Sequence, residues 1–408
     1  MQSTRLKLGI NNNPLQTDLR KVNYLDSLDW ELEDANTRYY THNYHTYSAK
    51  YIPQIPHYLI STLTNRNDII LDNFIGSGTT LVESKILDRH AIGIDINPLA
   101  CLVAKVKTTN IQKPDLEKIS AISRSIKEDI LKLRGSSGYN NTTPTFNLQD
   151  PESINNNDYL LANIPHPNIF KWFNKNVIYE LLTIKLKIDS IEEDHIRDFL
   201  LVAFSSILRS ISNATSGFGN LMINKHPPKK SNTYEKFNQV ASIMAANMEE
   251  FNQVTKNNSS VKIFNHDARN LRFIADETIT FICTHPPYMA SVPYAEYQKL
   301  SLWWLGFSQQ ELENKLIGGM RARRDTPERF FQDMFVTLTE MKRVLQKKKY
   351  CCIVIGNPIY NNTDWKLNEI IKKDASDIGF TLLKEITRRK YRLTMGKMKQ
   401  EFILIFKN

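Results

Sequence analysis

The stretch Ile69-Ile70-Leu71-Asp72-Asn73-Phe74-Ile75-Gly76-Ser77-Gly78-Thr79-Thr80-Leu81-Val82-Glu83 decides the fold of this chain. An apolar run ends at a carboxylate, two glycines follow, and a helix-forming run comes next. This pattern predicts a buried strand, a tight turn and a helix, in which the backbone of the turn can approach a ligand closely. It therefore predicts the first unit of an α/β sheet that binds ligands at the carboxyl ends of its strands.

A second apolar stretch, His90-Ala91-Ile92-Gly93-Ile94-Asp95-Ile96-Asn97-Pro98, follows the expected helix. It predicts a second strand that ends in an acid. A carboxylate at this place suits hydrogen bonding to the hydroxyls of a ribose. The alternative for Asp95 is a turn or cap residue.

Two further apolar runs lie much later in the chain. One runs from Val261 to Phe264 and leads to Asp267, and the other, Thr278–Cys283, leads to Thr284-His285-Pro286-Pro287-Tyr288. Since a proline cannot donate to a sheet ladder, the second strand should open abruptly into a rigid loop. Such a loop can hold backbone carbonyls and the exposed-looking ring of Tyr288 around a flat substrate. The alternative is an ordinary turn that ends a strand and has no part in function.

The remaining segments give the organisation of the chain. Residues 1–45 are polar without a clear period, which predicts an N-terminal arm or a short cap. Residues 111–257 predict a mostly helical insertion between two parts of one sheet-forming region, 46–110 and 258–408. The helices are expected at Lys113–Arg134, Asn176–Lys187, His195–Ile211 and Tyr234–Val254, and a closing antiparallel pair at Phe380–Thr387 and Glu401–Phe406.

Composition narrows the class of partner. The 408 residues include 41% hydrophobic ones, which is enough for sizeable cores, and carry a formal net charge of +10. This charge favours a polyanionic partner, with nucleic acid as the leading candidate. The four cysteines lack metal-ligand spacing, so we expect a reducing compartment and no metal site. No signal core or membrane-length apolar run occurs, which predicts a cytoplasmic protein without a membrane partner.

Two basic tracts are candidates for contact with phosphates. Lys225, Lys229 and Lys230 lie in a loop between two expected helices, and Arg321, Arg323 and Arg324 precede a helix. Such tracts suit contact with a nucleic-acid backbone. A solvated loop and a solvated helix entry are the alternatives.

In their order along the chain, the strand-end motifs described above resemble those of the amino-group DNA methyltransferases. These are S-adenosylmethionine-dependent enzymes that methylate the exocyclic amine of cytosine or adenine. Asp72–Thr79 resembles the family's Asp-Pro-Phe-x-Gly-Ser-Gly-Thr motif, except at Asn73. Thr284–Tyr288 resembles the Thr-Ser-Pro-Pro-Tyr of cytosine-N4 enzymes, whereas adenine-N6 relatives carry Asp or Asn before the prolines. Thr46–Pro53 is similar to a tyrosine-alanine-lysine-phenylalanine segment that lines the cofactor pocket.

The resemblance implies a Rossmann-like methyltransferase fold with a mixed sheet, a closing antiparallel hairpin and a mostly helical insertion that contacts DNA. It implies that S-adenosylmethionine binds to the first, second and third strand ends and to the Tyr47 segment. The implied cofactor-binding residues are Tyr47, Ala49, Lys50, Asp72, Phe74, Gly76, Gly78, Thr79, Asp95, Asn97, Asp267 and Ala268. The implied catalytic residues are Thr284, His285, Pro286, Pro287 and Tyr288.

Each implied catalytic role has a chemical reason. The amine lone pair is delocalised into the base, so acceptors at residue 285 and at the Pro286 carbonyl would draw its hydrogens out of plane. Tyr288 would stack on a base flipped out of double-stranded DNA, which offsets part of the unstacking cost. Methyl transfer would then be direct, with catalysis mainly by positioning.

The departure at His285 affects the choice of base. Histidine accepts a hydrogen bond only through an unprotonated ring nitrogen, unlike serine, aspartate or asparagine. Cytosine N4 is the expected target, in a restriction-modification context with a possible endonuclease partner. The alternatives are adenine N6, a base amine in RNA, and an inert nucleic-acid-binding protein on a methyltransferase scaffold.

Overall fold

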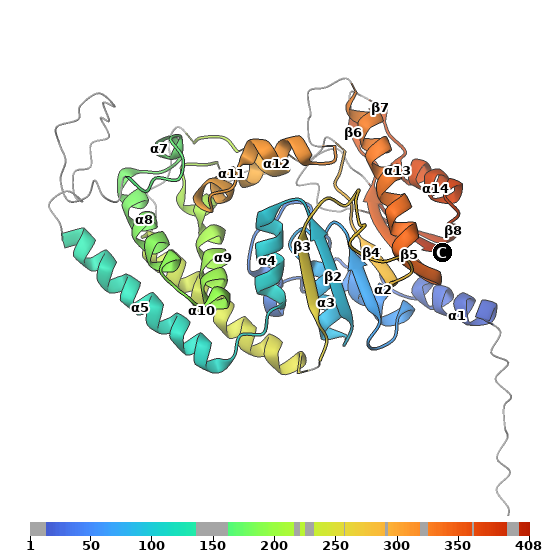
Figure 1. Ribbon diagram of the computed structural model, residues 1–408, viewed down its shortest axis with the longest axis horizontal. Coiled ribbons are helices and arrows are strands. Elements are labelled where there is room, and N and C mark those ends of the chain that lie inside the picture. Colours follow the sequence, from blue (N-terminus) through green and yellow to red (C-terminus); the bar gives the residue numbers. More distant parts are fainter. Residues whose placement is uncertain are drawn as a thin grey trace, which may run out of the picture.

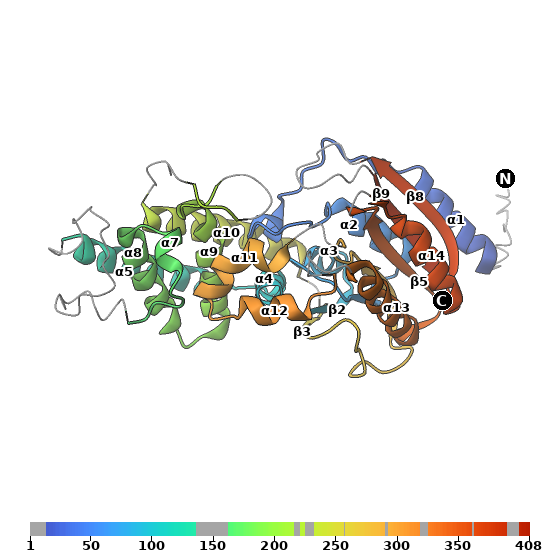
Figure 2. The ribbon, with the colours of Figure 1, turned by 90° about the horizontal axis from the view of Figure 1, so that it is seen from above.

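The structure is a computed structural model that describes residues 14–135, 162–215, 221–224, 232–256, 258–289, 293–318, 325–360, 363–389 and 400–408. Figures 1 and 2 show an elongated molecule with a helical lobe at one end and a sheet covered by helices at the other. The two regions meet along α4 (Pro98–Thr108), which contacts both the sheet and α9 (Asp194–Ile211).

The sheet has seven strands in the order β3-β2-β1-β4-β5-β9-β8. The first five in this order are parallel, and β9 runs antiparallel to both β5 and β8. The strands are β1 (Ile69–Asp72), β2 (His90–Asp95), β3 (Val261–Asn265), β4 (Ile279–Thr284), β5 (Leu345–Gly356), β8 (Thr381–Arg389) and β9 (Gln400–Lys407). A separate short pair is formed by β6 (Ile359–Tyr360) and β7 (Thr363–Asp364).

Alternate residues of the central strands enter two different cores. Leu71, Ile282 and Ile353 pack on one face of the sheet against α13 (Thr326–Val344) and α14 (Leu367–Asp377). Their neighbours in the strands, including Ile70, Phe281 and Val354, pack on the other face against α2 (Gln54–Leu63). Burial on both faces explains why these strands are nearly continuous apolar runs in the sequence.

Further helices complete the two regions. On the α2 face, α3 (Thr79–Ile86) and α4 pack over β2 through Leu81, Ala91 and Ala104. The helical lobe consists of α5 (Lys113–Gly135), α7 (Ile169–Trp172), α8 (Lys175–Asp189), α9 and α10 (Thr233–Val254) around one apolar core. In Figure 1, α11 (Tyr294–Trp304) and α12 (Gln309–Lys315) run across the top between the lobe and the sheet.

The N-terminal segment, for which an arm or a short cap is expected, contains two helices in its described part. Helix α1 (Pro14–Asp26) and a short 3₁₀ helix, η1 (Tyr40–Asn43), lie within it. Leu25 and Trp30 enter the core that α2 shares with the sheet, and the Tyr44 hydroxyl donates to the Met244 carbonyl of the lobe at 2.7 Å. The described part of this segment therefore packs against both regions. Its aromatic residues gave no periodic signal because they lie in irregular backbone.

The fold class predicted from the sequence is confirmed: an α/β fold with a mixed sheet, a closing antiparallel pair and a mostly helical insertion. The four helices expected in the insertion correspond to α5, α8, α9 and α10. Among the described residues, no helix combines the length and the apolar character needed to span a membrane.

Candidate functional site

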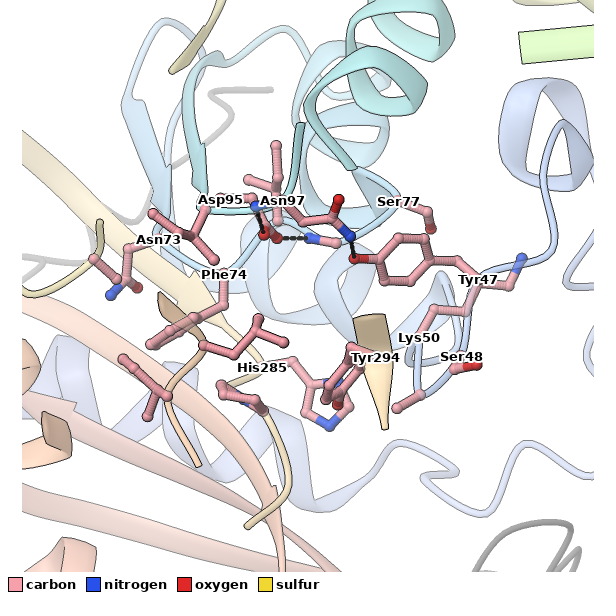
Figure 3. Close-up of a pocket in the computed structure, with 18 of the residues that line it drawn as sticks. Tyr47, Ser48, Lys50, Asn73, Phe74, Ser77, Asp95, Asn97, His285 and Tyr294 are labelled. Atoms are coloured by element: carbon pink, nitrogen blue, oxygen red, sulfur yellow. Dashed lines mark hydrogen bonds between the residues drawn. The ribbon is translucent and has the colours of Figure 1, made fainter. Parts of the chain in front are cut away.

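An open cavity lies where the strand order reverses, at the carboxyl ends of the parallel strands (Figure 3). The chain runs from β1 outward to β2 and β3, and then returns to β4 on the other side of β1. Loops that follow these strands consequently diverge and leave a crevice, which is where open α/β sheets bind ligands. Its lining includes Asn73 after β1, Asp95 at the end of β2, Asp267 after β3 and His285 after β4.

The cavity brings together most of the predicted site residues. Those that line it are Tyr47, Ala49, Lys50, Phe74, Gly76, Thr79, Asp95, Asn97, Asp267, Ala268, His285 and Pro287. Five other predicted residues, Asp72, Gly78, Thr284, Pro286 and Tyr288, are not part of the lining. The two basic tracts, Lys225, Lys229 and Lys230 and then Arg321, Arg323 and Arg324, lie outside the described residues.

The turn after β1 is shaped by Gly76. Its φ is +47°, a left-handed conformation that side-chain-bearing residues rarely adopt, and a Cβ there would lie 3.2 Å from the Tyr47 ring. The Gly76 amide donates to Asp95 Oδ2 at 2.8 Å. This contact joins the glycine turn to the end of β2 and keeps backbone at the cavity wall.

Gly78 lies next to the cavity lining and not in it. It lies at the N-cap of α3 with φ +80°, and a Cβ there would lie 2.7 Å from the Ala104 Cβ. The glycine thus allows α3 and α4 to approach closely. Its contribution to the cavity is indirect, through the packing of the helix that follows the turn.

Asp95 is held in place by two backbone amides. In addition to Gly76, the Asn97 amide donates to Asp95 Oδ1 at 2.9 Å, as Figure 3 shows. Burial raises the pKa of Asp95 to about 6, although these hydrogen bonds favour the charged form. The carboxylate can therefore lose its charge under mildly acidic conditions.

Asn97 connects three elements around the cavity. Its side-chain amide donates to Tyr47 Oη at 3.2 Å and to Gln298 Oε1 on α11 at 2.6 Å. Its Oδ1 accepts from the Leu99 amide at 3.1 Å and so caps α4. The ring of Tyr47 is consequently fixed against the glycine turn.

Asp72 and Thr284 lie beneath the cavity and join its two halves. Asp72 accepts from the Thr284 hydroxyl at 2.8 Å, from the Thr80 hydroxyl at 2.6 Å and from the Phe74 amide at 3.0 Å. Burial raises the pKa of Asp72 to about 6. The network ties the end of β1 to the end of β4 and to α3.

Lys107 on α4 supports the glycine turn from below. It is buried, and its Nζ donates to the Ser77 carbonyl at 2.8 Å. Burial lowers the pKa of Lys107 well below its usual value. A lysine that readily gives up its charge can support the turn without a fixed positive charge beside the cavity.

Asp267 has an arginine partner. Arg269 contacts Asp267 Oδ2 at 2.6 Å and Asp333 Oδ1 at 2.8 Å. Burial alone would raise the pKa of Asp267, but the hydrogen bonds and charge of Arg269 lower it below its usual value. This acid therefore remains a charged acceptor at the cavity edge.

Only part of the loop 284–288, for which a catalytic role is predicted, lies at the cavity. His285 and Pro287 line it, and the hydroxyl of Tyr288 lies 2.8 Å from His285 Nε2. The expectation of an exposed Tyr288 is wrong, since the residue is 5% exposed and its hydroxyl donates to Glu401 Oε1 at 2.9 Å. Base stacking by Tyr288 stays a prediction, while the ring of Tyr294 does line the cavity.

Polar side chains that the sequence had not assigned also line the cavity. Within the described part of the chain, Ser48 Oγ, Ser77 Oγ and both amide atoms of Asn73 are buried without a hydrogen-bond partner. Since buried polar atoms are rarely left unpaired, their position at the cavity wall indicates a polar ligand. The signal for Asn73 was its departure from the resembled motif. Nothing comparable marked Lys315, Leu316 and Ile317, which the fold brings here from the end of α12.

The described ranges contain no group of three or more His, Cys, Asp or Glu side chains arranged to hold a metal ion. Cys283, Cys351 and Cys352 are buried in the sheet, and Cys101 is partly buried. All four are free thiols. The polar groups that line the cavity are carboxylates, amides, hydroxyls, the amines of Lys50 and Lys315, and the imidazole of His285.

Comparisons with known proteins relate the chain to DNA methyltransferases. Residues 7–106 match the DNA methylase family. Type II methyltransferase M.MvaI from Kocuria varians is 30% identical over 311 residues, which cover 70% of this chain and 63% of that protein. Type II methyltransferase M.MjaII from Methanocaldococcus jannaschii is 43% identical over 101 residues, or 23% of this chain and 18% of that protein.

The chain therefore spans less than two thirds of the length of these relatives. Among solved structures, a SAM-dependent methyltransferase from Methanosarcina mazei is 11% identical, with a TM-score of 0.32 over 86% of this chain and 96% of that one.

Proposed function

Since the chain belongs to the amino-group DNA methyltransferase family, we propose that it transfers a methyl group from S-adenosylmethionine to the exocyclic amine of a base in double-stranded DNA. The proposal rests mainly on one observation: the residues of the glycine turn and His285 of the proline loop line the same cavity. A methyl donor and an acceptor base must meet at one place, and this cavity provides it.

The side chains present fit the cofactor. The buried and unpartnered amide of Asn73 and the hydroxyls of Ser48 and Ser77 offer donors and acceptors to the polar methionine end. Asp95 offers a carboxylate to the ribose hydroxyls, and Asp267 offers one to the adenine amine. The Gly76 turn lets the backbone approach the bound molecule closely. When bound, S-adenosylmethionine supplies an electrophilic methyl group on a sulfonium.

The residues of the proline loop would prepare the target amine. The imidazole of His285 would accept one amine hydrogen, and the carbonyl of Pro286 would accept the other. Both contacts favour the geometry in which the nitrogen lone pair leaves the plane of the base. Pro287 and the ring of Tyr294, which line the same cavity, offer apolar surface to the flat base. Catalysis then rests on positioning.

The finer parts of the proposal concern the base and the partners. Cytosine N4 is the proposed target, because Thr284–Tyr288 resembles the loop of cytosine-N4 enzymes more than that of adenine-N6 enzymes. The helical lobe between β2 and β3 is the proposed DNA-facing part and contributes to recognition of the target site. The names of the relatives, both Type II methyltransferases, support a restriction-modification role. A partner endonuclease stays a prediction.

Incubation of the protein with methyl-labelled S-adenosylmethionine and either duplex DNA or RNA tests this function. Label should enter the DNA in the wild type and fall to background in His285→Ala, while both proteins bind the cofactor in a calorimetric titration. Label in RNA alone would favour an RNA enzyme. Absence of both cofactor binding and label would indicate an inert scaffold.

A further inference from the structure

The ring of Tyr51 packs against the imidazole of His285 in the cavity wall. The two ring centroids lie 5.1 Å apart, and the ring planes are inclined by 49°. Both residues line the cavity, and Tyr51 is 7% exposed. Tyr51 comes from the segment before α2, whereas His285 follows β4. The contact therefore joins two distant parts of the sequence at the proposed site of methyl transfer.

The hydroxyl of Tyr51 is held beneath the cavity. Tyr51 Oη forms a hydrogen bond with Thr80 Oγ1 on α3 and lies 3.8 Å from Cys283 Sγ. The Thr80 hydroxyl donates its one hydrogen to Asp72 Oδ2 at 2.6 Å. Because an ionised carboxylate can only accept, Thr80 must receive the hydrogen of Tyr51 on its oxygen. Tyr51, Thr80 and Asp72 thus form a hydrogen-bond relay with a fixed direction.

The relay is shielded from water. Asp72 and Thr80 are 1% and 0% exposed. A polar group in such surroundings loses more from an unmade hydrogen bond than it would at the surface. The hydroxyl of Tyr51 is consequently tied to one place, and its ring is tied to the position in which it contacts the imidazole.

Asp72 reaches His285 by two routes. Its Oδ1 accepts at 2.8 Å from the hydroxyl of Thr284, the residue that precedes His285. Its Oδ2 accepts from Thr80, which holds the ring of Tyr51 against the imidazole. One route fixes the backbone where the proline loop begins, and the other supports the side chain.

We propose that Tyr51 is a positioning residue for methyl transfer. Its ring holds the imidazole of His285 in the orientation that the target amine requires, and the relay through Thr80 and Asp72 holds that ring. The catalytic effect rests on the proposed function, whereas the contact between the two rings does not. Asp72 would then connect the two halves of the site without lining the cavity itself.

Single-turnover methylation at saturating cofactor and DNA tests the role of the ring. Tyr51→Leu removes the ring and should lower the rate about 100-fold, the scale of a small misplacement near the reacting atoms. Tyr51→Phe keeps the ring but loses the hydroxyl and should lower the rate about tenfold, the scale of one hydrogen bond. Calorimetric titrations should give wild-type affinity for the cofactor in both variants.

Two results would overturn the proposal. One is a wild-type rate in both variants. The other is weaker cofactor binding with a wild-type rate at saturation, which would show that Tyr51 contacts the cofactor instead of positioning His285. If Tyr51→Leu does not fold, Tyr51→Phe alone decides between these results and the expected one.

Tyr44→Phe is the matched control. Tyr44 is 2% exposed, and its hydroxyl donates to the Met244 carbonyl at 2.7 Å, away from the cavity lining. Loss of this buried hydroxyl should lower the melting temperature, as Tyr51→Phe does, and leave the methylation rate unchanged. Equal losses of rate in the two phenylalanine variants would indicate a general structural effect and would overturn the proposal.

Variants of Thr80 test the relay. Thr80→Ser keeps the hydroxyl and should retain the wild-type rate, whereas Thr80→Val should lower it. In a Tyr51→Phe background the valine change should lower the rate by a smaller factor, because the hydrogen bond between the two hydroxyls is already lost. Independent losses of rate that simply multiply would show that Thr80 does not act through Tyr51, and would overturn the relay.

Proton NMR examines the contact without catalysis. An aromatic ring at this distance shifts the imidazole signals of its neighbour, and His285 is assigned among the nine histidines from the spectrum of His285→Asn. Its ring signals should move in Tyr51→Leu and stay in place in Tyr44→Phe. Unmoved signals in Tyr51→Leu would overturn the proposal. No methylation by the wild type would refute the proposed function and leave the NMR result intact.

Discussion

The Thr284 hydroxyl donates to the Asp72 carboxylate at 2.8 Å, although 212 positions separate the two residues in the sequence. This bond joins the ends of β1 and β4, the two strands on either side of the point where the sheet order reverses. The glycine turn follows one strand and the proline loop follows the other. This buried hydrogen bond, together with the pairing of the two strands, holds the proposed donor and acceptor halves of the site side by side.

Thr284→Val tests this connection. It removes a hydroxyl from a fully buried position and leaves Asp72 with one donor fewer, so unfolding free energy should fall by about 1–3 kcal/mol. Thr284→Ser keeps the hydroxyl and should retain both stability and methylation. Denaturant unfolding and single-turnover rates measure the two effects. Equal stability of the valine and serine variants would contradict a structural role for the bond.

Asn73 and Asn97 form a matched pair, since both are buried and line the cavity. The Asn73 amide has no hydrogen bond to lose within the described residues, whereas Asn97 makes three. Asn73→Ala should therefore weaken cofactor binding about tenfold, the scale of one hydrogen bond, without lowering the melting temperature. Asn97→Ala should lower both. Calorimetry measures the affinity and thermal unfolding measures the melting temperature. Unchanged affinity in Asn73→Ala would show that this amide does not bind the cofactor.

Cofactor affinity should depend on pH through Asp95. Ribose hydroxyls donate to a charged carboxylate, and burial raises the pKa of Asp95 to about 6. The affinity for the cofactor should thus be highest near neutral pH. It should weaken as the pH falls through 6, by at most about tenfold for each pH unit. Asp72, with a pKa also near 6, lies outside the cavity lining.

Titrations of the wild type and Asp95→Asn at several pH values distinguish the two acids. The asparagine variant should bind more weakly at neutral pH and show a flatter pH dependence. If both proteins lose affinity in parallel, Asp95 is not the group responsible.

Gly78→Ala tests the packing of the two helices behind the turn. The substitution places a Cβ at φ +80° and 2.7 Å from Ala104 Cβ, so the unfolding free energy should fall by at least about 1–3 kcal/mol. Gly135→Ala, where a Cβ would meet no atom within 4 Å, is the control and should leave stability almost unchanged. Similar stability of the two variants would contradict the close approach of α3 and α4.

Much of the fold could be predicted because its strands are buried on both faces. The run Ile69–Leu71 is apolar throughout, the run Thr278–Cys283 is apolar apart from its two threonines, and each ends in a sharp change of residue type. The helices of the lobe were also predictable from their amphipathic period. The N-terminal segment was not, because Trp30 and Tyr44 are fixed by partners distant in the sequence.

The site was predictable where a motif lies at one strand end and less so where contacts are long-range. The cavity contains Asp95, Gly76 and His285 as expected. The sequence could not distinguish lining residues from supporting ones, because the direction of the Asp72 side chain depends on Thr284, far away in the chain. The burial of Tyr288 likewise depends on Glu401, in the last strand.

The central claim is methyl transfer to a base amine, and mass spectrometry of nucleosides tests it most directly. DNA from cells that express the wild-type protein should contain N4-methylcytosine, and DNA from cells that express His285→Ala at the same level should not. N6-methyladenine in place of N4-methylcytosine would show that adenine is the target base and would still support methylation of an exocyclic amine. Unmodified DNA in the presence of folded, cofactor-binding protein would contradict the account.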